Sequence, residues 1–199
     1  MNNRSELMPF SVIIPAAGNS GRMGSDKAQL EYSEGQTFAG HLVKCYSTFG
    51  ARPVVIIVNE NQKQIDFGND TVIRVVNKHV EYGRSHSIFL GLQQIPQGCA
   101  CFIQNIDNPF FETALLEQMS ALTENDGFVV PEWNGKGGHP VLLGQNVVRY
   151  IKGLKDLNDF REVLIKVKRI VLPYQDERIL WNINTPGDYK RFIKMKGCN

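Results

Sequence analysis

One loop near the N-terminus carries glycines and cations at a spacing suited to binding phosphate. Gly18, Gly21 and Gly24 are three residues apart, Arg22 lies among them and Lys27 follows. Backbone without side chains can bring several N–H groups close to a phosphate, and the two cations can neutralise its charge. The glycines do not follow the G-x-G-x-x-G order of a dinucleotide fold, and no G-K-[ST] follows as in a P-loop. The loop therefore predicts a polyphosphate site of a different kind.

A carboxylate at the end of an apolar run is the second candidate. Asp107 follows residues 101–106 and precedes Asn108-Pro109. In an open α/β sheet, ligands gather at the carboxyl ends of strands. Mg²⁺ prefers hard oxygen ligands and shares them with phosphate and water. An aspartate that begins a turn or caps the next helix would have the same sequence, so the pattern alone leaves both alternatives open.

Short β-rich runs alternate with helical patterns along the chain, which predicts an α/β protein around a largely parallel sheet. The expected strands are residues 11–16, 53–59, 72–77, 101–106, 127–131, 139–143, 169–172 and 179–182. Three glycines in residues 132–138 predict a loop that closes over a substrate or, equally, a plain turn between strands.

Apolar stripes and end signals predict three helices. Residues 38–49 carry apolar side chains on one stripe, and the pattern stops at Gly50. A second helix follows Asn108-Pro109, and its expected inward side chains are Leu115, Leu116, Met119 and Leu122. The last helix should begin at Thr185-Pro186-Gly187-Asp188, where threonine can cap the helix and the aspartate can reach back.

Length and composition bound the kind of protein. At 199 residues with a net charge of +2, the chain predicts one domain over residues 1–199, with residues 1–9 loosely ordered. No basic block points to nucleic acid or an anionic membrane, and the N-terminus lacks the apolar stretch of a signal peptide. The four cysteines form no C-x-x-C, so we expect reduced thiols, no structural metal and a cytoplasmic location.

The glycine loop resembles the signature of the MobA-like nucleotidyltransferases. The family has L-A-A-G-x-S-x-R-M-G-x-D-K, and residues 15–27 here are P-A-A-G-N-S-G-R-M-G-S-D-K. The resemblance implies a three-layer α/β/α Rossmann-like nucleotidyltransferase fold with a mostly parallel mixed sheet. It also implies catalytic roles for Arg22, Lys27 and Asp107. Asp107 would hold Mg²⁺, which Mn²⁺ could replace.

A second segment resembles the family along the nucleotide. Residues 77–91 are similar to the family's N-P-x-x-x-x-G-M-S-x-S-x-x-x-G, with Arg84 in place of the methionine. The nucleotide-binding residues that the resemblance implies are Ala16, Ala17, Gly18, Asn19, Ser20, Gly21, Gly24, Asn77, Gly83, Ser85 and Ser87. A serine at a helix start can also cap the helix, so only one of the two serines needs a ligand.

Two further motifs resemble the family near the second substrate and the metal. Gly138-His-Pro-Val-Leu matches a motif of the cytidylyltransferase branch, which implies that His139 lies beside the acceptor or the closing loop. Residues 182–188, N-I-N-T-P-G-D, stand where many relatives have D-I-D-T-P-E-D. Asn184 can offer Mg²⁺ a carbonyl oxygen but no negative charge, so the metal should depend more on Asp107.

These resemblances imply a Mg²⁺-dependent nucleotidyltransferase that moves an NMP group from an NTP to a phosphorylated acceptor and releases pyrophosphate. CTP is favoured because Ala17 leaves less room for a purine than glycine would. The acceptor would be molybdopterin, as in molybdenum cofactor biosynthesis, or a sugar or alditol phosphate. A nucleotide-binding sensor or assembly protein without turnover is the alternative from another class. The glycine order argues against a dinucleotide-binding oxidoreductase.

Overall fold

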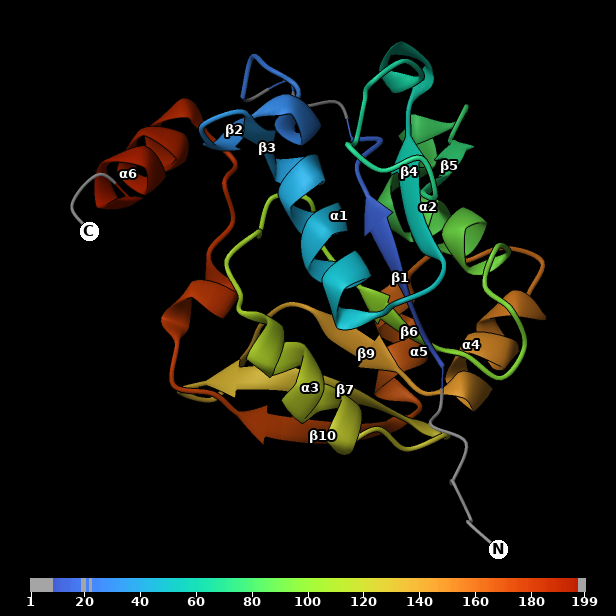
Figure 1. The fold of residues 1–199 in the computed structure, drawn as a ribbon. Helices are drawn as coiled ribbons and strands as arrows, with labels where there is room; N and C mark the ends of the chain where they lie inside the picture. The colour runs from blue at the N-terminus through green and yellow to red at the C-terminus, as the bar shows by residue number, and fades with distance from the viewer. Residues whose placement is uncertain (1–8, 19–20, 22, 197–199) are drawn as a thin grey trace, which may run out of the picture.

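A computed structural model describes residues 9–18, 21 and 23–196, and an eight-stranded sheet forms its centre (Figure 1). The strand order is β10-β7-β9-β6-β1-β4-β5, and β8 pairs with β7. The strands are β1 Phe10–Pro15, β4 Val54–Val58, β5 Ile73–Val76, β6 Ala100–Ile103, β7 Gly127–Trp133, β8 Lys136–Gly137, β9 Val141–Leu143 and β10 Lys168–Pro173. β9 is antiparallel to both neighbours and β8 to β7, while the other pairs are parallel. The mostly parallel mixed sheet is confirmed.

Helices cover both faces of this sheet, as Figure 1 shows. One side carries α1 Phe38–Phe49, α3 Thr113–Ala121 and, at its edge, α6 Pro186–Lys196; the other carries α2 Gly83–Leu92, α4 Gln145–Lys152 and α5 Phe160–Ile165. Side chains alternate between the two faces of a strand, so Ile14 of β1 packs in one apolar layer and Ile13 in the other. The predicted three-layer α/β/α architecture is confirmed.

The order of the strands creates a crevice beside β1. From β1 the chain moves outward through β4 to β5, and it then returns to place β6 on the opposite side of β1. Helices that follow two such neighbouring strands leave in opposite directions, which leaves space above the strand ends. The carboxyl ends of β1 and β6 are therefore where this fold most readily admits a ligand.

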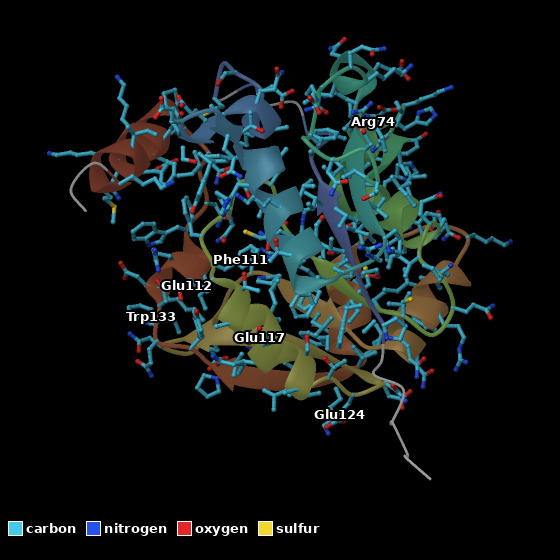
Figure 2. The ribbon with its side chains drawn as sticks, in the orientation of Figure 1. Arg74, Phe111, Glu112, Glu117, Glu124 and Trp133 are labelled. Atoms are coloured by element: carbon cyan, nitrogen blue, oxygen red, sulfur yellow. The ribbon has the colours of Figure 1, made fainter. Side chains whose placement is uncertain are left out.

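The predicted helices on the first face are confirmed, with one correction. Thr37 caps α1 by accepting a 3.1 Å hydrogen bond from the N–H of Gly40. In α3 the inward side chains of Leu115, Leu116 and Met119 are buried. The expectation for Leu122 was wrong: α3 ends at Ala121, and Leu122 remains 39% exposed. Phe111, labelled in Figure 2, packs its ring on Tyr46 of α1 just before α3 begins.

Residues 179–182 do not form the expected strand. The short 3₁₀ helix η4, Glu177–Leu180, takes up the first two of these residues, and the carboxylate of Asp176 caps it by accepting a bond from the N–H of Arg178. The carbonyl of Ile179 accepts hydrogen bonds from His139 N–H and from the side chain of Asn108. Because these partners satisfy the backbone, the segment does not pair with a neighbouring strand.

The short elements between β1 and α1 were not predicted. The strands β2 Glu31–Ser33 and β3 Gln36–Thr37 form a small antiparallel hairpin. Before it, the 3₁₀ helix η1, Lys27–Gln29, is capped by Asp26, whose carboxylate accepts a 2.9 Å bond from Ala28 N–H. A single capped turn leaves little apolar periodicity in the sequence, which explains why it was missed.

Other expectations concern cysteines and membranes. The described cysteines Cys45, Cys99 and Cys101 are free thiols, and burial raises the pKa of Cys101 to about 12. Within the part of the chain that the structure describes, no helix is long and apolar enough to cross a membrane. The expectation of loose order for residues 1–9 lies, apart from Pro9, outside the described residues.

The contact of α2 with the sheet gives a test of the packing. A Cβ on Gly91 would approach the side chain of Ile13 to 2.7 Å. We expect Gly91→Ala to lower the free energy of unfolding by about 1–3 kcal/mol through overpacking, more than the helix gains from alanine. Gly187→Ala in α6, where the nearest atom would be 3.6 Å away, is the control. Equal or higher stability of Gly91→Ala in denaturant unfolding would contradict this packing.

Candidate functional site

A cavity of about 230 Å³ lies at the crevice beside β1. Its walls come from the end of β1, the end of β6 and the start of α2. The lining residues are Pro15, Ala16, Ala17, Gly18, Lys27, Val80, Gly83, Arg84, Ser87, Asn105, Ile106 and Asp107. The structure thus brings together the glycine loop, Asp107 and the segment after β5, which the sequence had suggested separately.

Lys27 is the centre of the polar contacts in this cavity. Its ammonium nitrogen Nζ lies 3.0 Å from Asp107 Oδ2 and 2.7 Å from Asn184 Oδ1. The side chains of Lys27 and Asp107 are only 16% and 19% exposed. An ion pair with this little water around it is screened less than a surface pair. The two sequence-predicted catalytic residues that the structure describes therefore meet directly, and Asn184 joins them.

Backbone contacts hold the C-terminal segment against the cavity. The N–H of Ile183 donates a 2.9 Å bond to the carbonyl of Asp107. Asp188 Oδ2 accepts bonds from the N–H groups of Asn184 and Thr185, and Thr185 Oγ1 accepts one from Asp188 N–H. The predicted capping of α6 is confirmed, and it fixes Asn184 as well as the helix.

Asn108 is a residue that the sequence did not single out. It is fully buried, and its Nδ2 donates to the carbonyls of Ile179 and Trp181. Those contacts hold the chain leading to Asn184 against the end of β6. The neighbour of a candidate catalytic aspartate is thus a structural clamp. No spacing in the sequence indicates this, because the two partners lie more than 70 positions further along.

The oxygens that would hold a metal ion already converge on a cation. Asp107 Oδ2 and Asn184 Oδ1 both face the ammonium of Lys27. Carboxylate and amide oxygens are ligands that Mg²⁺ accepts, together with phosphate oxygens and water. Among the described residues, no group of three or more His, Cys, Asp or Glu could hold a metal ion. The pair therefore fits a divalent ion that also takes ligands from a bound phosphate.

A buried glutamine holds the glycine loop in place through hydrogen bonds. Gln62, 2% exposed, donates through Nε2 to the carbonyl of Ala16 at 3.1 Å and to both carboxylate oxygens of Asp26 at 2.8 and 2.9 Å. Its Oε1 accepts the N–H of Asn59 at 2.8 Å, and Asn59 Nδ2 donates to the carbonyl of Ala17. Since Asp26 caps the turn that carries Lys27, Gln62 connects the loop to the position of that lysine.

The loop residues divide into three groups. Ala17 and Gly18 line the cavity, as does Ala16, whose N–H is occupied by a 2.8 Å bond to the carbonyl of Ile57. Gly21 and Gly24 line an adjoining hollow with Gly18 and Asp26. The predictions for Asn19, Ser20 and Arg22 lie outside the described residues.

The structure separates the roles of the two serines. Neither caps α2, because its N-cap residue, Tyr82, has no side-chain capping bond. Ser87 lines the cavity, and its Oγ accepts a 3.0 Å bond from Asn77 Nδ2. Ser85 Oγ instead accepts the N–H of Phe160, at the start of α5. The expectation that a serine caps this helix was wrong, and Ser87 is the one that faces the ligand space.

Asn77 and Gly83 hold the shape of this wall. Asn77 is 1% exposed, and both ends of its amide are used, by Ser87 Oγ and by the N–H of His79. Gly83 has φ 79° and ψ −169°, a conformation that other residues rarely adopt. The resemblance suggested both residues as nucleotide contacts. In the structure Gly83 lines the cavity and Asn77 supports it from behind.

His139 does not line the cavity, but it contacts a residue that does. Its Nε2 is 2.7 Å from Nδ2 of Asn105, which lines the cavity wall. Burial, and to a lesser degree the charge of Arg84, lower the pKa of His139 to about 3. The imidazole is therefore neutral at physiological pH, and it can position Asn105 but supplies no positive charge to an acceptor.

Of the two alternatives predicted for residues 132–138, the structure has the form of a plain turn between two strands. Glu132 and Trp133 of β7 pair with Gly137 and Lys136 of β8, with Asn134 and Gly135 between them. Asn134 has φ 48° and Gly135 has φ 76°, as a tight hairpin turn requires. Closure of this hairpin over a substrate stays a prediction.

Comparisons with known proteins agree with this architecture. A family model described as the MobA-like NTP transferase domain matches residues 12–170. The molybdenum cofactor cytidylyltransferase of Escherichia coli is 25% identical over 185 residues, which cover 92% of this chain and 95% of that protein. A probable molybdenum cofactor guanylyltransferase of Natranaerobius thermophilus is 26% identical over 203 residues, covering 94% and 96%.

A solved structure shares the fold at lower identity. The Rv0371c protein of Mycobacterium tuberculosis superposes with a TM-score of 0.77 and 17% identity, covering 94% of this chain and 98% of that one. The same protein is also known in a complex with manganese. At this level of identity the likeness shows the fold.

Replacing Gln62 tests the support of the loop. We expect Gln62→Glu to lower the free energy of unfolding at pH 7 by about 1–3 kcal/mol, because a second carboxylate then faces Asp26 and the carbonyl of Ala16. Repulsion raises the pKa of the introduced carboxyl, so the penalty is present at neutral pH and shrinks as the pH falls towards 4. Denaturant unfolding of variant and wild type across this range, with Gln118→Glu on the exposed face of α3 as control, makes the comparison. A penalty independent of pH would argue against the contact.

The neutral His139 predicts an acid-sensitive fold. The folded pKa of about 3 lies below the ordinary value of 6.5, so the unfolded chain binds a proton that the folded chain does not between these values. Stability from this group is complete above pH 6.5 and is lost as the pH falls, by about 2 kcal/mol at pH 5. We expect His139→Gln to lose less stability than wild type between pH 7 and pH 5 in denaturant unfolding. Identical losses would contradict a buried neutral imidazole.

Proposed function

Because the chain belongs to the MobA-like NTP transferase family and is a nucleotidyltransferase, we propose that it moves an NMP group, CMP in preference, from an NTP to a phosphorylated acceptor and releases pyrophosphate. The observation that carries the proposal is the meeting of Lys27, Asp107 and Asn184 at the strand crossover beside β1. A cation and two hard oxygens at this point suit a reaction on phosphate.

Charge stabilisation and positioning would do most of the work. A phosphate oxygen of the acceptor attacks the α-phosphorus, and the bond to the β-phosphate oxygen breaks. Lys27 would then leave Asp107 to neutralise charge on the transferring and leaving phosphates, together with Arg22 and the N–H groups of the loop. Asp107 and Asn184 would hold Mg²⁺, or Mn²⁺ in its place, and the ion would add charge at the reacting phosphates.

Substrate choice is proposed from the cavity wall and from relatives. Ala17 is 2% exposed, and its methyl group narrows the wall where the base would enter. Relatives are named as cytidylyl- and guanylyltransferases of the molybdenum cofactor, so molybdopterin with CTP is our first choice of substrates. A sugar or alditol phosphate as acceptor follows the same chemistry, and a curated relative is named 2-C-methyl-D-erythritol 4-phosphate cytidylyltransferase.

A sensor or assembly protein that binds nucleotide without turnover is the second candidate. Its support is that Asn182 and Asn184 stand where the family motif that residues 182–188 resemble has acids. Asn182 Nδ2 donates to the carbonyl of Leu180, and Asn184 bonds Lys27, so only Asn184 reaches the site. An amide in place of a carboxylate weakens the hold on a divalent ion. This candidate predicts nucleotide binding with little dependence on Mg²⁺.

Removing the central charges tests the proposal. We expect Lys27→Ala and Asp107→Asn to reduce pyrophosphate release by about 10²–10³, because each removes preorganised charge at the reacting phosphates. Release is measured with CTP, GTP, ATP and UTP, with Mg²⁺ and with molybdopterin or a panel of sugar and alditol phosphates. Lys194→Ala, an exposed lysine of α6, is the matched control.

The outcomes separate the two candidates. Release with CTP and one acceptor, abolished in both variants, would support a metal-dependent cytidylyltransferase and name its substrate. Wild-type turnover in Lys27→Ala would remove the assignment. Tight nucleotide binding without release, with any acceptor, would favour the sensor.

A further inference from the structure

Arg84 is a cation in the cavity that the proposed reaction has not used. It is the second residue of α2 and lines the same cavity as Lys27 and Asp107. In the family pattern that residues 77–91 resemble, methionine stands at this position. The substitution replaces an apolar side chain with a guanidinium at the wall of the site. The change points to a ligand with more negative charge near α2.

The Arg84 side chain has no direct partner within the described part of the chain, where it forms no hydrogen bond or ion pair. Arg74, Arg169 and Arg178, in contrast, each donate to a carbonyl or a carboxylate. The surrounding protein lowers the pKa of Arg84 by desolvation, and the charge of Asp107 opposes this effect. The residue is nevertheless exposed, so an anion in the cavity can reach its guanidinium and form charged hydrogen bonds with it.

A second arginine, Arg161, is close enough to Arg84 for its charge to affect that residue. Arg161 follows Phe160 at the start of α5, and its charge also lowers the pKa of Arg84. The N–H of Phe160 donates a 3.0 Å bond to Ser85 Oγ, which holds the start of α5 against α2. Asp159 Oδ1 accepts the N–H of Arg161 and fixes the same turn. Two like charges are thus kept near each other by the fold, which an anion between them would stabilise.

We propose that Arg84, with Arg161 beside it, binds the phosphate monoester of the acceptor. This inference rests on the proposed function and adds to it a residue that touches the second substrate. The glycine loop and Lys27 face the triphosphate from the β1 side, whereas the two arginines belong to α2 and α5. The planar guanidinium can donate two parallel hydrogen bonds to phosphate oxygens, which a point charge cannot do.

The position of Arg84 would also reduce the electrostatic repulsion between the two substrates. A monoester oxygen must approach an α-phosphate that is itself anionic, and the two repel each other. The oxygen forms a bond to the α-phosphorus while the bond to the bridging oxygen breaks, and pyrophosphate leaves with that electron pair. No proton has to be removed from a monoester dianion. Arg84 would neutralise the incoming dianion and orient one of its oxygens.

The experiment measures the two ligands separately. Methyl phosphate is the probe for the acceptor, and α,β-methylene CTP with Mg²⁺, which does not release pyrophosphate, is the probe for the nucleotide. Phosphorus NMR titration gives the Kd of methyl phosphate with the nucleotide analogue bound, and calorimetry gives the Kd of the analogue. The variants are Arg84→Gln and Arg84→Lys, and Arg149→Gln on the exposed face of α4 is the control.

We expect Arg84→Gln to weaken methyl phosphate binding by about 10–100-fold, the range for losing charged hydrogen bonds, and to leave the analogue within about twofold. The Kd of methyl phosphate for Arg84→Lys should lie between the values for wild type and Arg84→Gln, because lysine keeps the charge but cannot donate two parallel hydrogen bonds. Weaker binding of the analogue with unchanged methyl phosphate binding would assign Arg84 to the nucleotide and overturn the inference, as would no change in either.

The wild-type protein separates this inference from the proposed function. A wild type that binds neither the CTP analogue nor its ATP, GTP and UTP counterparts overturns the proposed function. A wild type that binds a nucleotide analogue but not methyl phosphate overturns only the role of Arg84.

Discussion

The ammonium of Lys27, shared between Asp107 and Asn184, is the interaction on which the rest of the site depends. It joins residues 80 and 157 positions apart in the chain. Such a contact requires that β1 and β6 lie side by side and that the C-terminal segment return across their ends. It also sets two oxygens around one cation, an arrangement that a phosphate and a divalent ion can take over.

Buried amide side chains give this cluster a rigid frame. Gln62 holds the glycine loop and Asp26 together, while Asn108 holds the segment that leads to Asn184. Both lie at the ends of central strands, where backbone carbonyls leave the sheet and need donors. Loss of such a donor leaves a buried acceptor unpaired, so these residues link the stability of the fold to the geometry of the cavity.

The described residues that line the cavity include more positive than negative side chains. Lys27 and Arg84 face one carboxylate, that of Asp107, and His139 stays neutral behind Asn105. A wall with an excess of positive charge favours anionic ligands. Lys27 and Arg84 lie on different elements, which suits a reaction that brings two phosphorylated substrates together.

Local patterns in the sequence determined most of the fold and part of the site. Alternating β-rich and helical runs predicted the layers, and the glycine spacing marked the loop, because both depend on residues a few positions apart. Tertiary structure decided the remainder: that residues 179–182 leave the sheet, that Ser87 rather than Ser85 faces the cavity, and that Gln62, Asn105 and Asn108 support it. Each of these depends on hydrogen bonds between segments more than 30 positions apart, or on burial next to them. These partners meet only when the strands assemble into the sheet, and the periodicity of a single segment does not predict them.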